Sequence, residues 1–422
     1  MRRLGPAMQE RDFRLWWIAL LIMDLGFQMI EVVIGWQVYS LHRRAIDLGL
    51  IGLAEFVPML LFAVPAGQLA DRLPRRPVFA AALALGGLVA GGLAVLTGAG
   101  VTATAPFLAL AFGVGTANTL GSPASQAMAP NLVSSAQLPS AMNLRAAAVQ
   151  IGTIAGPALG GLLYGFSPSL VYGLAGVASF GAVGLVWAMH PRPAALSATD
   201  SLLRPEPATL SDAFAGLGFV ACTPILLGAI LLDLLGVLFG GAVALLPVFA
   251  RSVLHTGAAG VGFLRTAPAV GALLAAVWLA RRPLGARTGR LLLTVVAAFG
   301  VSMVVFGFSR SYPLSLAALA VSGYVDAFSM NIRSTIVALA TPDALRGRVN
   351  AVAMVFVSAS NQLGAFESGV AAALVGAVPA VVGGGVVTVV LAAVWSRLFP
   401  PLAGVDRLDE VRPLEPPLGV PA

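Results

Sequence analysis

Lysine is missing from this chain of 422 residues, and all 25 of its basic residues are arginine. A phosphate-binding loop of the Walker type needs a lysine to reach the nucleotide, so an ATP-driven motor of that kind is excluded. A retinal-type pump is excluded as well, because its chromophore is held by a Schiff base to lysine. Any uphill movement of a solute must therefore draw on an ion gradient or on a separate partner.

Cysteine and histidine are almost as scarce. The single cysteine, Cys222, rules out an intrachain disulfide and is expected to be a small buried apolar residue. The three histidines, His42, His190 and His255, fall in loops or at the ends of apolar runs, so no buried metal cluster is predicted. HExxH, GxSxG and GxGxxG are absent from the sequence, which argues against an intramembrane enzyme.

Charged side chains make up only 10% of the residues, whereas 58% are apolar. A soluble domain carries charge on about a quarter of its residues, so most of this protein's surface must face lipid. The arginines form short clusters between apolar runs and not one basic stripe, so nucleic acid is not an expected partner.

Twelve apolar runs are long enough to cross a bilayer, which takes about 20 helical residues. The sequence therefore predicts an all-α polytopic membrane protein with both termini on one side. The runs are 15–40, 48–69, 78–98, 102–125, 142–165, 168–189, 219–250, 257–280, 290–309, 312–340, 350–374 and 377–399. Arg2, Arg3, Arg11 and Arg14 directly precede the first run, which is typical of a cytoplasmic start and an uncleaved first span.

The arginines indicate which side is cytoplasmic. If the first loop faces outward, nineteen arginines lie in cytoplasmic segments, four in outer loops (Arg43, Arg44, Arg251 and Arg310) and two inside spans (Arg265 and Arg333). The positive-inside rule then places both termini in the cytoplasm.

A weak internal repeat divides the spans into two sets of six. Leu69–Arg72 is matched by Leu279–Arg282, and Leu138–Asn143 by Leu345–Asn350. We therefore expect an N-terminal half at 1–189, a cytoplasmic linker at 190–218, a C-terminal half at 219–399 and a disordered cytoplasmic tail at 400–422.

Eight charged residues fall inside the spans, where a charge costs at least about 2.5–3.5 kcal/mol. Spans 3, 6, 9 and 12 contain none of them, and we interpret these four as scaffold helices that face lipid and the other eight as helices that can line a polar cavity. The charged residues are Asp24, Glu31, Glu55, Asp233, Arg265, Asp326, Arg333 and Glu367.

Asp24, Gln28 and Glu31 share one face of span 1, because they are spaced i, i+4 and i+7. The two carboxyl groups lie about ten ångströms apart, from a rise of ~1.5 Å per residue. Either group can carry a proton or contact a substrate. The alternative is a carboxylate that is tied to an arginine of the other half and does not titrate.

Further acids lie in the second half. Asp326 and Arg333 share a face of span 10, where a structural ion pair competes with a substrate role. Asp233 is central in span 7 and Glu367 lies in the outer half of span 11; both are candidates for proton coupling or substrate contact. Glu55 and Arg265 lie nearer the outer edge of their spans. Contact with water there would account for their charges as well as a functional role would.

Two motifs add information beyond hydropathy. The loop after span 2 holds an acid and three cations, which suit helix capping and contacts to phosphate or carboxylate groups. Small residues in span 5 allow another backbone to approach closely, and a proline there bends the helix. The residues are Gly67, Asp71, Arg72, Arg75 and Arg76 in the loop, and Gly152, Gly156, Pro157, Gly160 and Gly161 in span 5.

On these motifs the chain resembles the major facilitator superfamily, with the loop similar to the family's signature and the span 5 run to its antiporter motif. The segments Phe13–Trp16, Gly121–Gln126 and Asn143–Gly161 resemble the enterobactin-exporter-like branch. The similarity covers about residues 10–400. It departs from the family at Pro74, and in the lack of a span 4 arginine that many proton-coupled exporters carry. Proton coupling is therefore expected on span 1.

The resemblance implies a twelve-helix fold of two six-helix halves that exports a small hydrophobic or siderophore-like molecule by proton antiport and alternating access. Asp71 would act as a latch: it would hold the cytoplasmic side closed by a contact with the second half near the start of span 11. We expect a monomer in the inner membrane of a bacterium, with no cofactor beyond the proton gradient. Uptake or facilitated diffusion by the same fold is the first alternative, and a receptor or an intramembrane enzyme is the second.

Overall fold

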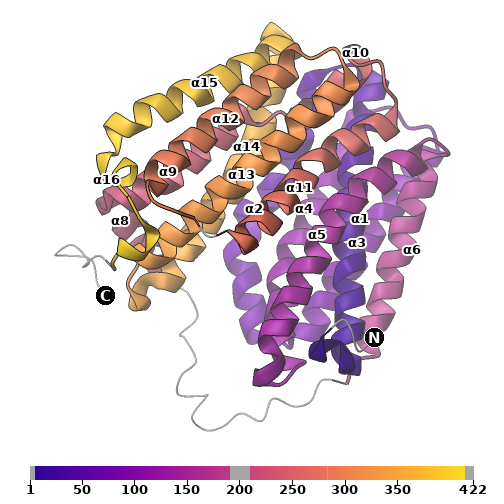
Figure 1. Cartoon of the computed structure of the whole chain (residues 1–422). Coiled ribbons are helices and arrows are strands. Elements are labelled where there is room, and N and C mark those ends of the chain that lie inside the picture. Colours follow the sequence, from indigo (N-terminus) through magenta and orange to yellow (C-terminus); the bar gives the residue numbers. More distant parts are fainter. Residues whose placement is uncertain (1–4, 191–209, 283, 414–422) are drawn as a thin grey trace. The chain divides into compact units, whose positions relative to one another are not determined.

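The structure is a computed structural model that describes residues 5–190, 210–282 and 284–413 (Figure 1). Only the backbone is described at residues 63, 64, 66–72, 210–215 and 344. Helices and short 3-10 turns are the only regular elements across these described ranges, which confirms the predicted all-α class.

The long helices follow the predicted runs. In the first part of the chain they are α1 (Arg11–His42), α2 (Ala45–Arg72), α3 (Arg75–Gly98), α4 (Thr104–Met128), α5 (Leu138–Tyr164) and α6 (Pro168–Trp187). After residue 209 they are α8 (Leu210–Cys222), α9 (Pro224–Gly240), α10 (Leu246–Ser252), α11 (Ala258–Arg281), α12 (Thr288–Phe308), α13 (Tyr312–Ala340), α14 (Arg346–Val375) and α15 (Ala377–Leu398).

The predicted span at 219–250 corresponds to one stretch, Pro224–Ser252, that is long and apolar enough to cross a membrane, but it starts later than predicted and is divided into α9 and α10. The backbone is extended at Thr223, and Pro224 then starts α9, where its missing N–H costs no hydrogen bond. Gly241 is extended as well and ends α9. Cys222, expected to be buried, is exposed at the end of α8.

Eleven stretches within the described residues are long and apolar enough to cross a membrane. The long helix outside this set is α4, whose run is interrupted by polar residues such as Asn118 and Gln126. With α4 the helices match the twelve-span fold predicted from the sequence.

The chain forms two compact units. Unit 1 comprises residues 1–43, 53–207 and 256–266, and unit 2 comprises 44–52, 208–255 and 267–422. The start of α2 therefore belongs to unit 2, and the start of α11 to unit 1. The domain boundaries expected from the sequence stay a prediction.

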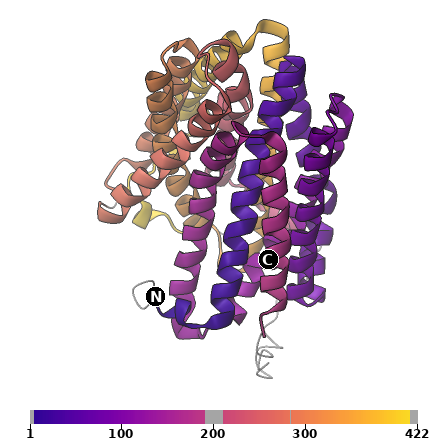
Figure 2. The same cartoon turned by 90° about the vertical axis from the view of Figure 1, so that its right-hand side faces the viewer.

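The same helix pairings recur in the two units. In unit 1, α1 packs against α5 and α6, and α3 packs against α4 and α6 (Figure 2). In unit 2, α9 packs against α14 and α15, and α12 packs against α13 and α15. If the helices are numbered as the predicted spans, each pair in unit 2 is a pair of unit 1 with six added to both numbers. This agreement is expected of the internal repeat.

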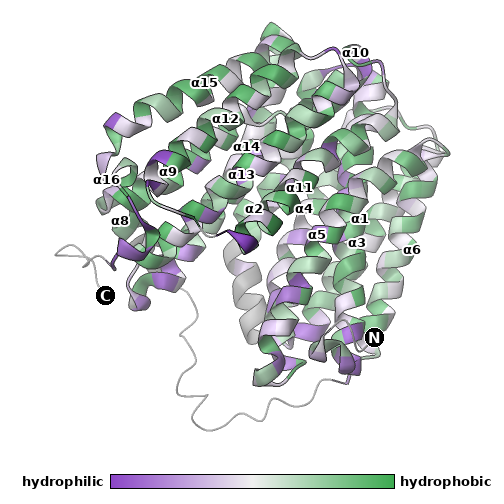
Figure 3. Ribbon diagram, viewed as in Figure 1, coloured by the Kyte–Doolittle hydropathy of each residue, from purple (hydrophilic) through white to green (hydrophobic). Residues whose placement is uncertain are grey.

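Each unit has its own apolar core. Phe13, Trp16 and Phe79 are fully buried in unit 1, as are Phe219 and Leu226 in unit 2. The outward faces are hydrophobic too, and hydrophilic residues gather at helix ends (Figure 3). The helices that carry no charge at depth, α3, α6, α12 and α15, show many exposed large side chains, among them Leu88, Val177, Val301 and Val390. This pattern fits scaffold helices that face lipid.

The predicted disorder of the tail is wrong for residues 400–413. Leu402, in the short helix α16 (Pro400–Ala403), is completely buried in the core of unit 2. The carboxylate of Asp406 accepts a hydrogen bond of 2.9 Å from the backbone N–H of Arg287, just before α12. An apolar anchor and a helix cap thus order this segment. Residues 414–422 lie outside the described part.

Candidate functional site

The acidic face of α1 lies against the glycines of α5. A Cβ atom added at Gly152 would lie 2.8 Å from Cβ of Asp24, and one at Gly156 would lie 2.6 Å from Cβ of Gln28. At Gly160 it would lie 3.0 Å from the carbonyl oxygen of Met29. The motif glycines are therefore needed because any side chain would push α5 away from the polar residues of α1.

Replacing Gly156 by alanine is expected to lower the free energy of unfolding by about 1–3 kcal/mol, because the new methyl group overpacks the contact with Gln28. Thermal unfolding of the purified protein measures this change. Gly173→Ala on α6 is the matched control, since nothing lies within 4 Å of its added Cβ. Equal stability of the two variants would contradict the assigned role of Gly156.

Glu31 forms an ion pair with Arg265 of α11, within unit 1. The two side chains are only 20% and 19% exposed. The hydroxyl of Thr266 donates to the carbonyl of Ile154 at 2.9 Å, which fixes the same turn of α11 on α5. The pairing of an α1 acid with an arginine from the second half of the sequence was the alternative left open above, and for Glu31 it is present.

Glu55 of α2 is a second acid near this arginine, and one that sequence reasoning did not select. It is 4% exposed, and the charges of Glu31 and Arg265 both act on it. Its Oε1 is buried without a hydrogen-bond partner in the described part of the chain. A Cβ atom at Gly115 of α4 would clash with the carbonyl oxygen of Glu55 and lie 2.9 Å from its Cα, so α4 packs closely on this turn. The charge of Arg265 thus acts on two carboxyl groups, and the recorded ion pair is with Glu31.

Asp24 has a different environment. Its Oδ2 is buried without a hydrogen-bond partner among the described residues. The charge of Arg145 on α5 acts on it, but within the described ranges no ion pair of 4 Å or less joins the two. The Nε of Arg145 is also buried and unpartnered there. Arg145, counted above with the cytoplasmic segments, lies inside α5.

In unit 2, Arg333 of α13 binds two acids. It is 9% exposed, pairs with Asp233 of α9, and lies 3.8 Å from Asp326, so the predicted pairing with Asp326 is present. Its Nε donates to the carbonyl of Ser329 at 3.2 Å. A cavity of about 20 Å³ lies beside the three charged groups, and the hydroxyl of Ser329 is unpartnered within the described ranges. This space suits one water molecule.

Glu367 of α14 is not part of that cluster. It is partly buried, and the hydrogen bond recorded for its carboxylate is a long one of 3.5 Å from Ser368. The same hydroxyl donates to the carbonyl of Gly241 at 2.9 Å, after α9. A role for Glu367 in coupling stays a prediction.

The arginines after α2 cap neighbouring helices of unit 1. Arg75 donates to the carbonyl of Ala127 near the end of α4, at 2.5 Å. Arg76 donates to the carbonyls of Val186 and Trp187 at the end of α6 and lies 5.0 Å from the centre of the Trp187 ring. These two cations therefore donate to free carbonyl oxygens at helix C-termini. Their observed partners are backbone groups and not the phosphate or carboxylate groups expected from the sequence.

The side chains of Gly67, Asp71 and Arg72 lie outside the described residues, so the predicted latch at Asp71 stays a prediction. Groups of three or more histidine, cysteine, aspartate or glutamate residues that could hold a metal ion do not occur in the described part of the chain.

Comparisons with known proteins agree with this architecture. The profile of a family described as transmembrane secretion effector matches residues 3–418. The enterobactin exporter EntS of Shigella boydii serotype 18 is 27% identical over 332 residues, which cover 78% of this chain and 77% of that protein. EntS of Escherichia coli O139:H28 matches to the same extent.

Solved transporters share the fold. The nucleoside transporter NupG has a TM-score of 0.70 at 16% identity, and the match covers 92% of this chain and 99% of that protein. The D-xylose–proton symporter has a TM-score of 0.68 at 14% identity, and the match covers 94% of this chain and 99% of that protein. The chain is therefore a multi-pass membrane transporter of the major facilitator superfamily and belongs to the transmembrane secretion effector family.

Proposed function

We propose that this transporter exports a small hydrophobic or siderophore-like molecule in exchange for protons. The observation that carries the proposal is the pair of acids in unit 1, Asp24 and Glu55, each with one buried carboxyl oxygen that lacks a partner in the described part of the chain. A carboxyl group in an apolar site is less costly when it is neutral, so such groups bind and release protons as their surroundings change between dry and wet.

The pairing of Glu31 with Arg265 shifts the expected proton carrier from Glu31 toward Asp24 and Glu55. A carboxylate that is bound to a guanidinium has its charge compensated already. The unpartnered oxygens of Asp24 and Glu55 are not compensated in this way, so a proton there removes a buried charge.

Three observations support export of a siderophore-like molecule. The matched family is described as a secretion effector, and the relatives with 27% identity are enterobactin exporters. In addition, the glycines of α5 that resemble the antiporter motif contact the acidic face of α1. The arginine distribution supports a bacterial inner membrane location with both termini cytoplasmic. The proton gradient supplies the energy, and no cofactor is needed.

Inverted membrane vesicles from cells that produce the protein test this proposal. With an acidic interior, they are expected to accumulate radiolabelled enterobactin, and nigericin, which collapses the pH gradient, is expected to abolish the accumulation. Equilibration that is insensitive to nigericin would overturn antiport and indicate facilitated diffusion. Accumulation of ethidium but not of enterobactin would retain antiport and overturn the siderophore assignment.

A further inference from the structure

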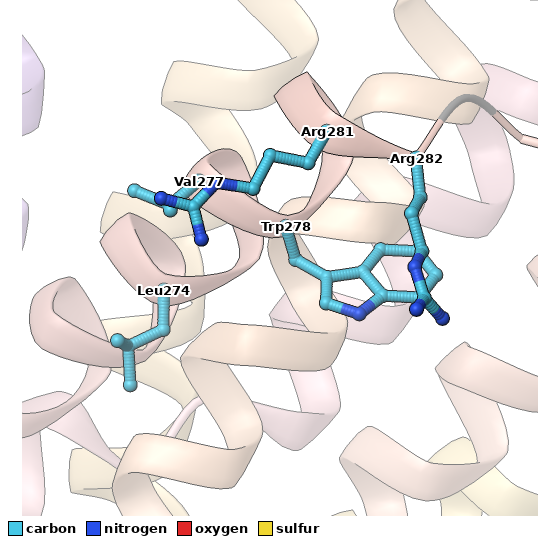
Figure 4. A pocket seen from close by; sticks show the side chains of 5 residues that line it. All are labelled: Leu274, Val277, Trp278, Arg281 and Arg282. Carbon is cyan, nitrogen blue, oxygen red and sulfur yellow. The ribbon is translucent and has the colours of Figure 1, made fainter.

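A groove lies along the last two turns of α11 in unit 2, away from the buried charges. It encloses about 380 Å³ and is lined by apolar and basic side chains only (Figure 4). The lining residues are Leu274, Val277, Trp278, Arg281 and Arg282. This end of α11 is also one copy of the internal sequence repeat, for which the transport cycle described above assigns no role.

The spacing of these residues makes the groove amphipathic along the helix axis. Leu274, Val277, Trp278 and Arg281 follow one another at i, i+3, i+4 and i+7, so they share one face of α11. The apolar side chains occupy the inner turn and the two arginines the last turn. Figure 4 shows the side chain of Arg281 turned back along the helix toward Val277, and that of Arg282 beside the ring of Trp278.

The aromatic side chain of the groove, Trp278, is held in place by residues of α13. Trp278 packs against Phe328 of α13, with ring centres 5.3 Å apart, and Phe328 packs in turn against Tyr324 at 5.1 Å. Trp278 still leaves 41% of its surface open, and Leu274 leaves 58%. The groove therefore offers a preformed apolar surface that neighbouring helices do not cover.

The two arginines have no internal counter-ion. Arg281 and Arg282 are exposed, and neither side chain forms an ion pair or a hydrogen bond within the described ranges. The arginines that lie deeper, Arg265 and Arg333, each bind at least one carboxylate. Two adjacent positive charges at the end of an apolar helix run are thus left for an external anion.

We propose that this groove binds one anionic phospholipid of the surrounding membrane. The two guanidinium groups bind its phosphate through charge-assisted hydrogen bonds, and an acyl chain lies along Leu274, Val277 and Trp278. A soluble phosphate would leave the apolar part of the groove unused. A zwitterionic lipid would gain less than an anionic one, because its ammonium group is repelled by the same two arginines.

The site is tested by measuring lipid retention on the purified full-length protein with native mass spectrometry. The protein is offered phosphatidylglycerol, phosphatidylcholine or soluble glycerol phosphate. Phosphatidylglycerol is expected to bind at least tenfold more tightly than the other two. Arg281→Gln with Arg282→Gln is expected to weaken its binding about thirtyfold, which corresponds to about 1 kcal/mol for each arginine.

The control is Arg43→Gln with Arg44→Gln, which removes the same charge from an exposed pair between α1 and α2 and should leave retention unchanged. Equal weakening by both double variants would show a general surface effect and overturn the proposal. So would undiminished retention by the α11 variant, or glycerol phosphate binding as tight as that of the lipid.

A second measurement works on chains with intact arginines. Phosphatidylglycerol with brominated acyl chains should quench the tryptophan fluorescence of the unmodified protein more than that of Trp278→Phe, because bromine quenches only at short range. Equal quenching of the two proteins would place the bound lipid elsewhere and overturn the site. Neither measurement depends on the transported molecule, so their outcomes are separate from those for proton antiport.

Discussion

Proteoliposomes that contain the Asp24→Asn variant are expected to lose transport driven by a pH gradient and to fall to the level of protein-free liposomes. Asparagine keeps the shape of the side chain and its packing against Gly152 but cannot take up a proton. Substrate binding should persist, because the amide still offers an acceptor oxygen. Radiolabelled substrate flux under an imposed pH gradient, together with equilibrium binding, measures both effects.

The matched control for that variant is Asp12→Asn on the same helix. Asp12 accepts a hydrogen bond of 3.2 Å from the backbone of His190 near the chain surface, so its loss should leave coupling intact. The double variant Asp24→Asn with Glu31→Gln should be no more defective than Asp24→Asn alone. Gradient-driven flux at the unmodified rate in that double variant would contradict a coupling role for α1.

The Arg333→Gln variant is expected to show the largest loss of stability. Removing the guanidinium leaves Asp233 and Asp326 facing each other without a counter-ion, and breaking a buried ion pair costs about 3–5 kcal/mol. Thermal unfolding in detergent should show a large decrease in the midpoint temperature.

A double-mutant cycle separates the ion pair from simple loss of packing. Adding Asp233→Asn to Arg333→Gln removes one of the stranded charges and should recover part of the lost stability. The comparison variant is Arg346→Gln, whose partner Asp343 is 88% exposed and whose ion pair should contribute little. An Arg333→Gln variant as stable as Arg346→Gln would show that the cluster is not a structural one.

Hydropathy predicted the fold because the bilayer imposes one length and one composition on every span. It misplaced the start of span 7 and missed the interruption inside it, because apolar side chains continue where the helical backbone breaks. Pro224 after an extended Thr223, and Gly241 after α9, cause the break, and their chemistry gives the only signal of it in the sequence. The ordered tail was missed for a related reason, since a few scattered side chains, such as Leu402, Leu408 and Asp406, anchor a segment rich in proline and charge.

The candidate site was predictable in part. Asp24, Glu31, Asp233, Asp326 and Arg333 were selected because they are charged and lie inside spans. A charged side chain in lipid costs too much free energy to be present without a structural or functional role. It was harder to predict which of these residues pair with one another, because pairing between helices that are far apart in the sequence gives no local sequence pattern. Arg265 and Glu55 were therefore judged by their depth, although Arg265 binds Glu31 and acts on Glu55.

Arg145 shows a different limit of sequence reasoning. It stands before the most apolar part of its run, so positive-inside counting assigned it to a loop. In the structure it lies inside α5, on the helix that carries Gly152 and Gly156. Its effect on Asp24 depends on the close approach of α1 and α5 that those glycines permit, and this approach is a tertiary feature.

The central claim is that outward movement of substrate is exchanged for inward movement of protons through the acids of unit 1. Proteoliposomes with the pH-sensitive dye pyranine inside test it most directly, with a substrate gradient and no imposed pH gradient. The account predicts that substrate entering the lumen drives protons out and raises the internal pH, and that Asp24→Asn and Glu55→Gln abolish the change. Substrate movement with a constant internal pH in the unmodified protein would contradict it.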